Sequence, residues 1–539
     1  MSKELHFQSD AQTRLLRGAT LLTNAVKITL GPKSQSVLIE KKWGAPIVCN
    51  DGVTIAKEIE LKDPVENMGA KMLCEVAERT GDAVGDGTST ATILAHAIFA
   101  EGIRNVTAGA SAIDLKRGLD RGVKIAIETI HSLSKKITTR QEKEQIATIS
   151  AHNDPAIGKL VADAIEKVGG DGVISVEEAR GTETTVEVVE GMQFDRGYSS
   201  PYFVTDAAKM EAKFERPYIL LYDKKIGSIE PVVPLLEQII KTGRPLVIIC
   251  EEIEGEALAM MVVNKLRATL SCVGVKAPGF GDRRKEMLED IAILTGGRVI
   301  SEELGIKLEH VKLEDLGQAS RVVANKDTTT IIGGSGAKKA ISDRIALIRS
   351  QIEKEKSQYD KEKFQERHAK LSGGVAVVRV GAPSEAELKS KKEALDDAIS
   401  ATKAAVAEGI VPGAGLSLLR AIDALDKAGE KLSGDEKTGF AILKHALEAP
   451  TRQIAENSGE DGGVVVNQMR KGTGSYGFDA AKREYVDLAQ EGIIDPTKVV
   501  RTALENAVSV ASVLLLTQAT LTETKEEKKS IESNLAEAS

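Results

Sequence analysis

The sequence predicts a multidomain protein in which two mostly helical end segments enclose an α/β middle. At 539 residues the chain is too long for a single hydrophobic core. The first 130 residues and the stretch from Gly409 to about Leu521 share an alanine-rich pattern with helical spacing. Between them, residues 217–301 alternate apolar runs of strand length with helical segments, which is typical of an α/β module with parallel strands. The middle is therefore expected to be an insertion into a domain built from both ends.

The first end segment predicts four helices and one pair of strands. Residues 10–30 place apolar side chains at helical spacing and stop at Gly31-Pro32, which is a helix stop signal. Residues 36–40 and 46–49 are expected to be strands, followed by a turn at Asn50-Asp51-Gly52. The further expected helices cover residues 64–80, 88–109 and 114–133.

The middle and the second end are expected to continue as follows. Strands are predicted at 172–176, 184–189, 217–222, 245–250, 272–276 and 298–301, and helices at 255–270 and 283–294. Residues 338–372 predict a helical hairpin with a break near residue 359, and residues 385–408 predict one long helix. The segment GGSGAKK (333–339) lacks the spacing of a phosphate loop and is interpreted as a flexible turn. The polar tail from Thr522 is expected to be disordered.

Composition excludes several classes of function. The net charge of −8 argues against sequence-independent binding of nucleic acid, which needs a basic face. The four cysteines form no CxxC pair, which argues against zinc and favours free thiols in a reducing compartment. The N-terminus lacks the pattern of a signal peptide. The apolar stretch 506–522 contains Asn, Ser, Thr and Gln, so we expect a buried helix and no membrane association.

The stretch GDAVGDGTSTATILAHAIF (81–99) is the strongest local signal for chemistry. Its glycines allow close approach of the backbone to a ligand, and its hydroxyls stand where a helix begins, so the helix start could bind an anion. Asp86 beside a phosphate would require a bridging cation, for which Mg²⁺ is the natural choice. The alternative is an ordinary Asp-Gly turn before a capped helix. The stretch is not a Walker A loop, because no GKS or GKT follows the glycines.

Other acidic residues could complete such a site. Asp51 and Asp495 lie in turns, and Asp397 lies within a predicted helix. Together with the turn TLGPK (29–33) they would form a Mg-nucleotide site suited to phosphoryl transfer, if folding brings them together. Each aspartate also has a plain interpretation as a turn or cap residue. No GxSxG or HExxH motif supports a serine hydrolase or a zinc peptidase.

The middle module carries a signal for binding. Tyr198, Tyr202 and Phe203 fall in the loop RGYSSPYFVTD, whose polar composition predicts a surface position. The helix at 255–270 is apolar over more than one face, which fits either a fully buried helix or a helix that exposes apolar side chains to a partner.

Eleven motifs in order then resemble one family. They are TLGPK (29–33), NDGV (50–53), GDGTST (85–90), EGMQFDRGYSSPYF (190–203), EGEALAMMVVN (254–264), KAPGFGDRRK (276–285), EDLGQASRVV (314–323), KDTTTII (326–332), KLSGGVAVVRVG (370–381), AEGIVPGAG (407–415) and GIIDPTKVVR (492–501). The sequence is similar in all of them to the group I chaperonins of the GroEL type, from about residue 5 to residue 521.

The resemblance implies a three-domain subunit with nested connectivity. Residues 1–132 and 408–539 would form a mostly helical equatorial domain that binds ATP. Residues 133–189 and 376–407 would form a small α/β intermediate hinge domain, and residues 190–375 an α/β apical domain that binds substrate and lid. It also implies a homo-oligomer of two stacked rings of seven, a GroES-type co-chaperonin as lid, unfolded client proteins as substrates, and a bacterial, cytoplasmic location.

The resemblance also assigns site residues, position by position. Asp397 and Asp51 would be catalytic, with Asp397 placing the attacking water, and Asp86 would hold Mg²⁺. The nucleotide would be surrounded by Thr29, Leu30, Gly31, Pro32, Asn50, Asp86, Gly87, Thr88, Ser89, Thr90, Gly413, Ala414, Asp479, Ala480, Ala481 and Asp495. Substrate and lid would bind to Tyr198, Tyr202, Phe203, Val233, Leu236, Leu258, Val262, Val263 and Asn264, which favours the exposed interpretation of the helix at 255–270.

Four departures from the family pattern concern affinity and the tail. Pro412-Gly413-Ala414-Gly415 replaces the usual triple glycine, Asn50 replaces a frequent lysine, and Asp479 replaces a frequent asparagine. The tail lacks Gly-Gly-Met repeats. An ATP-driven folding chamber is expected, because Asp51, Asp86 and Asp397 are all present. The alternatives are a scaffold that kept the fold without cycling, and a small-molecule kinase.

Overall fold

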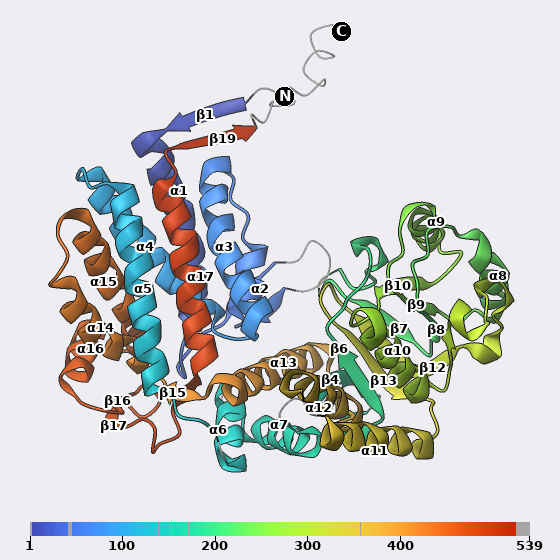
Figure 1. Cartoon of the computed structure of the whole chain (residues 1–539). Coiled ribbons are helices and arrows are strands. Elements are labelled where there is room, and N and C mark those ends of the chain that lie inside the picture. The colour runs from blue at the N-terminus through green and yellow to red at the C-terminus, as the bar shows by residue number, and fades with distance from the viewer. Residues whose placement is uncertain are drawn as a thin grey trace, which may run out of the picture. The chain divides into compact units, whose positions relative to one another are not determined.

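The computed structural model describes residues 3–40, 46–137, 139–151, 154–169, 172–179, 181–207, 209–355 and 357–523, with the backbone alone for Leu304, Gln358, Tyr359, Glu362 and Ala386. The chain forms two compact units, one of residues 1–162 with 385–539 and one of residues 163–384 (Figure 1). The middle is thus inserted into a unit made from both ends, as the sequence predicted. The finer division into three domains stays a prediction.

Long helices build the first unit. They are α1 (Gln8–Val26), α3 (Pro64–Val84), α4 (Thr88–Thr107), α5 (Ala112–Leu133), α13 (Glu385–Glu408), α14 (Leu416–Gly429), α15 (Gly434–Asn457) and α17 (Thr497–Leu516). Local chemistry explains their ends, as α3 shows. Asp63 accepts hydrogen bonds from the N–H groups of Val65 and Glu66 at 2.9 and 3.0 Å, and Gly85 ends the helix in the left-handed conformation with φ 71°.

Small residues allow the helices of the first unit to pack closely. A Cβ at Gly18 of α1 would lie 1.7 Å from the carbonyl oxygen of Glu66 in α3, and one at Gly69 would lie 2.0 Å from that of Leu15. Glycine at both positions therefore lets α1 and α3 cross at backbone contact. Their core continues through leucines, isoleucines and Phe99, which is completely buried.

Helix α17 lies among the other helices of this unit, and Figure 1 shows it in red beside α5 and α3. Among the described residues, α17 is the one helix that is both long enough and apolar enough to cross a membrane. However, 61% of its apolar window is buried inside the protein. Its apolar residues Ala503, Leu504, Ala507 and Leu515 belong to the core. The expectation of a buried helix in this part of the sequence is confirmed.

Shorter elements complete the first unit. The helices are α2 (Gly52–Glu58), α6 (Arg140–Ser150), α7 (Pro155–Val168), which continues into the second unit, and α16 (Gly462–Lys471). The strands form antiparallel pairs: β1 (Lys3–Phe7) with β19 (Ala519–Glu523), β2 (Val37–Ile39) with β3 (Ile47–Cys49), β15 (Ile410–Pro412) with β18 (Ile494–Pro496), and β16 (Tyr476–Asp479) with β17 (Glu484–Asp487).

Two sheets lie in the described part of the second unit. In the larger one β10 (Cys272–Lys276), β9 (Leu246–Cys250), β8 (Tyr218–Tyr222) and β11 (Val299–Ile300) are parallel, while β12 (Gly317–Ala324), β13 (Thr329–Gly334), β6 (Gly191–Phe194) and β7 (Ala212–Glu215) pair antiparallel. The smaller sheet orders β4 (Val173–Glu178), β14 (Val375–Val380) and β5 (Thr185–Val189). The helices are α8 (Val233–Thr242), α9 (Gly255–Leu266), α10 (Gly281–Thr295), α11 (Lys338–Lys354) and α12 (Gln358–Ser372). The parallel α/β module and the helical hairpin are confirmed.

Several expectations about local structure were wrong. The turn at Asn50-Asp51-Gly52 leads directly into α2, and the sequence did not predict α2, α6 or α7. The segment GGSGAKK is held by packing, since a Cβ at Gly336 would lie 2.0 Å from the carbonyl oxygen of Ile293. Thr522 and Glu523 belong to β19, so they are not part of a disordered tail. Residues 524–539 lie outside the described part of the chain.

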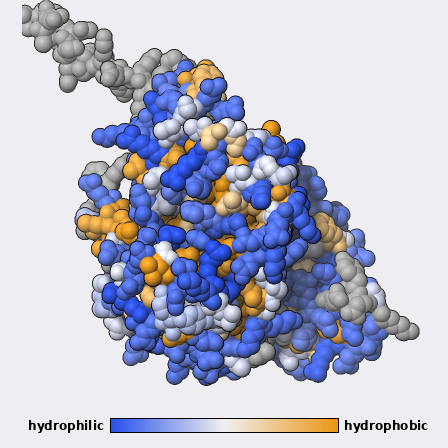
Figure 2. Space-filling model, turned by 90° about the vertical axis from the view of Figure 1, so that its left-hand side faces the viewer, coloured by the Kyte–Doolittle hydropathy of each residue, from blue (hydrophilic) through white to orange (hydrophobic). Residues whose placement is uncertain are grey.

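The surface of the first unit that faces the viewer in Figure 2 is largely hydrophilic, with apolar residues in small separate groups. Scattered apolar residues are usual on protein surfaces and need no partner.

The four cysteines are free thiols, and Cys49, Cys250 and Cys272 are buried.

Candidate functional site

The glycine loop between α3 and α4 takes its shape from close packing. Gly85 and Gly87 both have left-handed φ values, of 71° and 78°. A Cβ at Gly85 would lie 2.2 Å from Cβ of Ser400 in α13, and one at Gly87 would lie 2.6 Å from Val499 in α17. Glycine is therefore required at both positions, by conformation and by space. Asp86 is held between these two glycines.

Asp86 is fixed on both carboxylate oxygens. Its Oδ1 accepts the N–H of Gly87 at 2.5 Å, and its Oδ2 accepts the hydroxyl of Ser150 at 3.0 Å. Ser150 is the last residue of α6, a helix that the sequence analysis missed. Sequence reasoning therefore also missed Ser150, because a lone serine outside a glycine loop gives no signal.

Three segments that were predicted to surround the nucleotide, residues 29–32, 50–53 and 85–90, meet at this loop. Asp51 caps α2 by accepting the N–H groups of Val53 at 3.3 Å and Thr54 at 2.8 Å. The next residue, Gly52, lies against α4, since a Cβ there would be 2.4 Å from Oγ of Ser89. The hydroxyl of Ser89 lies 3.1 Å from that of Thr29. Residues 29–32, 50–53 and 85–90 are thus brought together, as the sequence analysis required.

The turn at Thr29, Leu30, Gly31 and Pro32 is held by a side chain that is distant in the sequence. Asn457, at the end of α15, donates hydrogen bonds to the carbonyl oxygens of Lys27 at 2.9 Å and Leu30 at 2.8 Å. Gly31 has a φ of 91°, which favours glycine. Asn457 is a second residue that the sequence analysis did not single out, since its partner segment is far away in the chain.

The start of α4 suits an anion. Thr88, Ser89 and Thr90 form its first turn, and no side chain in the described part of the chain caps it. Free N–H groups at a helix start and the helix dipole favour phosphate. Among the described residues no three His, Cys, Asp or Glu side chains form a ready metal site. A Mg²⁺ held by Asp86 would fit these residues, because Mg²⁺ takes few protein ligands and completes its shell with phosphate and water.

Four carboxylates influence one another here. Burial holds the pKa of Asp397 well above its ordinary value, and the like charges of Asp86 and Asp51 add to this shift. Burial raises the pKa of Asp495 to about 7, with a further contribution from Asp86. Carboxylates with raised pKa values are typical of sites that hold a cation or transfer a proton.

The second glycine loop, residues 413–415, belongs to the C-terminal segment of the first unit and lies beside Asp495 of this cluster. Gly413 donates its N–H to the carbonyl oxygen of Ile493 at 3.0 Å, and a Cβ there would lie 3.2 Å from Oδ1 of Asp495. Ala414 has a φ of 54° and Gly415 one of 73°. Alanine in this conformation costs roughly 1 kcal/mol, so Ala414 is strained where the family pattern has glycine. The hydroxyl of Thr451 donates to the carbonyl oxygen of Ala414 at 3.0 Å and supports it.

Asp479 organises the turn that follows β16. It is buried, and its Oδ1 accepts the N–H groups of Ala481 at 2.9 Å and Lys482 at 3.2 Å. Its side chain therefore shapes the turn that carries Ala480 and Ala481. Whether any of these residues touches a nucleotide stays a prediction, as does a role for Asn50.

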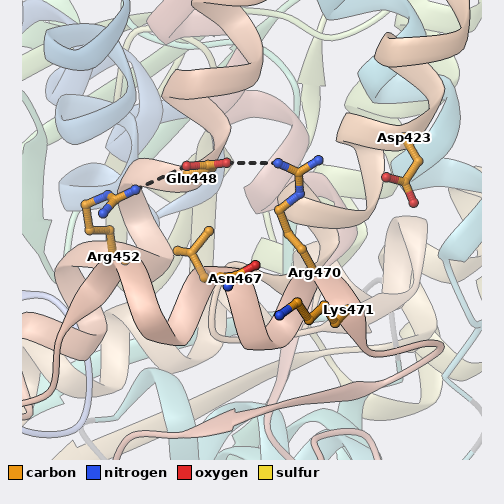
Figure 3. A pocket seen from close by; sticks show the side chains of 8 residues that line it. Asp423, Glu448, Arg452, Asn467, Arg470 and Lys471 are labelled. Atoms are coloured by element: carbon orange, nitrogen blue, oxygen red, sulfur yellow. Dashed lines mark hydrogen bonds and ion pairs between the residues drawn. The ribbon is translucent and has the colours of Figure 1, made fainter.

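A cavity among the described residues lies elsewhere in the first unit. It has a volume of about 410 Å³ and none of the predicted site residues line it. Figure 3 shows Glu448 between Arg452 and Arg470, each of which contacts one of its oxygens at 3.2 Å. The cations of this cavity are largely neutralised within the protein, so it is not the candidate site.

In the second unit, the predicted binding residues divide into exposed and buried ones. Tyr202, Val233 and Val263 are exposed by 67%, 38% and 40%, while Leu258, Val262 and Asn264 are half-buried. Tyr198, Phe203 and Leu236 are buried, and Phe203 is completely so. The expectation that Tyr198 and Phe203 lie at the surface of their loop was wrong, because both pack into the hydrophobic core of the unit.

Helix α9 exposes apolar side chains beside Tyr202. Met260 and Leu266 are exposed by 43% and 64%, whereas Ala257 and Met261 face the core. Lys265 joins the helix to the aromatic loop, because its ammonium donates to the carbonyl oxygens of Tyr202 at 2.9 Å and Val204 at 2.8 Å. The interpretation of α9 as a helix with exposed apolar residues is confirmed.

Comparison with known proteins identifies the family of this chain. Residues 22–525 match the model of the TCP-1/cpn60 chaperonin family. The chain is 66% identical over 527 residues to a protein named chaperonin GroEL 5 from Bradyrhizobium diazoefficiens, and this covers 98% of the chain and 97% of that relative. The chain therefore belongs to the TCP-1/cpn60 chaperonin family, in which it is a group I member of the GroEL type and a molecular chaperone.

Proposed function

We propose that this chaperone is driven by ATP hydrolysis with Mg²⁺, and that it encloses non-native proteins in a ring cavity. The assembly would consist of two stacked rings of seven, closed by a GroES-type co-chaperonin, in a bacterial cytoplasm. Residues 1–132 with 408–539 would act as the equatorial domain, 133–189 with 376–407 as the hinge, and 190–375 as the apical domain.

The convergence of Asp51, Asp86 and Asp397 at an uncapped helix start carries the proposal for ATP. Burial raises the pKa of Asp397 and the like charges of Asp86 and Asp51 add to this shift, so the cluster disfavours its own negative charges. Mg²⁺ held at Asp86 would supply the positive charge that lets these carboxylates and a triphosphate coexist. The hydroxyls of Thr88, Ser89 and Thr90 and the N–H groups of their turn would hold the phosphates.

Asp397 is the residue best placed to handle water. It lies in the middle of α13, and that helix packs against the glycine loop, since Ser400 fills the space beside Gly85. A carboxylate with a raised pKa can accept a proton from water more readily than an ordinary one. Asp51, which caps α2, would line the other side of the space that holds this water.

The exposed apolar residues of α8 and α9 support a client-binding surface. Val233 and Ile240 on α8, and Met260, Val263 and Leu266 on α9, leave apolar area in water. Apolar patches of this kind mark interaction sites, and non-native proteins offer matching apolar segments. Tyr198, Phe203 and Leu236 would then support the surface from beneath rather than contact a client.

Two small ribbons support oligomerisation. The pair β1–β19 exposes Leu5, Phe7 and Leu521, and the pair β2–β3 exposes Leu38 and Val48. An isolated two-stranded ribbon is marginally stable, and its open edges invite further strands. Contacts with neighbouring subunits would cover both ribbons.

Nucleotide binding and single-turnover hydrolysis by two variants test the proposal. Asp397→Ala should bind Mg-ATP within about threefold of the parent yet lose roughly 10²- to 10⁴-fold in hydrolysis rate, as expected for a water-positioning group. Asp86→Lys should fail at binding itself, because it removes the cation ligand and inserts a competing charge. Suppression of aggregation of a denatured client is measured alongside.

The outcomes separate the alternatives. A parent protein that binds clients but shows no ATP hydrolysis would be a scaffold, and one that transfers phosphate to a small acceptor would be a kinase. Hydrolysis by Asp397→Ala within a factor of about three of the parent would contradict the catalytic role of that residue.

A further inference from the structure

The nucleoside end of the proposed ATP site has an anchor of its own in α14. This helix begins directly after the loop of Gly413–Gly415, and Arg420 lies in its second turn. The guanidinium donates three hydrogen bonds to backbone carbonyl oxygens: Nη1 to Met469 at 2.9 Å, Nε to Gly474 at 3.1 Å and Nη2 to Tyr476 at 3.1 Å. One half-buried side chain thus holds the end of α16, the following turn and the first residue of β16.

The segment held in this way leads to Asp479. Strand β16 has four residues, begins at Tyr476 and ends at Asp479, which shapes the turn of Ala480 and Ala481. Its only sheet partner among the described strands is β17, and a ribbon of two short strands is marginally stable by itself. The position of Asp479 therefore depends on what fixes the ribbon.

Backbone bonds tie the same ribbon to the other wall of the site. Leu488, after β17, donates its N–H to the carbonyl oxygen of Ser475 at 2.9 Å and accepts the N–H of Ile493 at 2.8 Å. Ile493 in turn accepts the N–H of Gly413 at 3.0 Å. The turn after β16 and the loop before α14 are thus joined by two routes, one through this backbone chain and one through Arg420.

We propose that Arg420 is a positioning residue that sets the spacing between Gly413–Ala414 and Asp479–Ala481, and thereby the affinity for the nucleoside part of ATP. The proposal rests on the proposed function of this site in binding ATP. Arg420 acts through the backbone of residues 469–476. Only arginine can fill this role, because three donors on one rigid plane reach three separate carbonyl groups, whereas the donors of lysine sit on a single atom.

Arg470 offers a matched control on the neighbouring helix. It lies one residue after Met469, but its guanidinium contacts the side chain of Glu448 at 3.2 Å (Figure 3) and that of Asp426 at 3.7 Å. It therefore shares the position at the end of α16 without holding the ribbon. A change of arginine to lysine at each position separates anchoring of the ribbon from a general effect on α16.

The experiment compares Arg420→Lys and Arg470→Lys in the assembled protein. The half-saturating ATP concentration and kcat are measured by steady-state hydrolysis, and binding of Mg-tripolyphosphate, which lacks a nucleoside, is measured by calorimetry. Arg420→Lys should raise the half-saturating ATP concentration by at least about fivefold, with kcat and tripolyphosphate affinity each within about twofold of the parent. Arg470→Lys should match the parent in all three measurements.

An unchanged half-saturating concentration in Arg420→Lys, an equal loss for tripolyphosphate, or the same effect in Arg470→Lys would each overturn the proposal. If Arg420→Lys does not assemble, Arg420→Gln, which keeps two donors, must show the same nucleoside-specific loss. If neither assembles, Arg420 serves folding and the proposal fails. A parent protein without ATP hydrolysis would instead contradict the proposed function, so the two failures are distinguishable.

Discussion

Replacing Asp495 by asparagine should stabilise the nucleotide-free protein, and more so at high pH than at low pH. Asp495 lies in β18 opposite Val411, close to Gly413, and burial with the charge of Asp86 raises its pKa to about 7. A folded-state pKa above the ordinary 3.8 means that folding favours the protonated carboxyl. Stability from this group is therefore fully present below the unfolded pKa and is lost as the pH rises towards 7.

The size of the effect follows from the shift. A difference of about three pKa units corresponds to about 4 kcal/mol of unfolding free energy above pH 7, and this is an upper value because Asp495 is only half-buried. Part of the loss has already occurred at about pH 5, so the change between about pH 5 and pH 8 is about 2 kcal/mol. Asparagine keeps the shape of the side chain and carries no charge at either pH.

The assay is urea unfolding followed by circular dichroism, at about pH 5 and about pH 8, with chelator and without nucleotide. The stability of Asp495→Asn relative to the parent should increase by about 2 kcal/mol between the two pH values. Asp327→Asn, in an exposed turn of the second unit, is the control and should follow the parent. A constant difference between Asp495→Asn and the parent would show that Asp495 does not titrate in this range, which would refute the electrostatic account of the cluster.

Three further predictions concern separate parts of the chain. Tyr202→Glu should abolish capture of a denatured client and leave ATP hydrolysis intact, because Tyr202 is exposed. Phe203→Glu should instead reduce the yield of folded protein, because Phe203 is completely buried. Client capture by Tyr202→Glu equal to that of the parent would contradict the proposed client-binding surface. Gly87→Ala should lower the melting temperature and weaken ATP binding, since φ is 78° and the new Cβ would lie 2.6 Å from Val499; wild-type values in a thermal scan and a binding titration would show that the loop adapts. Removal of residues 524–539 should leave size and ATP hydrolysis unchanged in light scattering and steady-state assays, because β19 ends at Glu523; loss of assembly would show that this segment contributes contacts.

The sequence predicted the elements whose signals are local. Helices such as α13, and the parallel strands β8 to β11, carry their periodicity within their own residues, and glycines mark their ends. The helix α6 gave little signal because it is mainly polar, with Ile146 and Ala147 as its buried residues, and α7 was missed although it follows α6 directly. The glycine loops were found because positive φ values need glycine, and the structure has such values at Gly31, Gly85 and Gly87.

Other features depend on contacts between distant residues and left no local signal. Ser150 reaches Asp86 across 64 positions and Asn457 reaches Leu30 across 427. The burial of Phe203 was hidden for a similar reason, because the polar residues around it describe the surface of its loop, while the core that receives its ring comes from other strands. The glycine-rich stretch, the turns and the family resemblance all pointed to the aspartates, but the residues that hold the aspartates in place appear only in the structure.

The pairing of β1 with β19 and the insertion of the second unit have a consequence for synthesis of the chain. A ribosome that works from the N-terminus completes the strands and helices of residues 163–384 as one continuous stretch, so this unit can fold while translation continues. The helices α3, α4 and α5 must wait, because α17 packs against them, and β1 must wait for its partner strand β19. Their apolar faces stay uncovered on the nascent polypeptide until the final segments emerge. A protein that protects others from aggregation is therefore itself exposed to aggregation while it is being made.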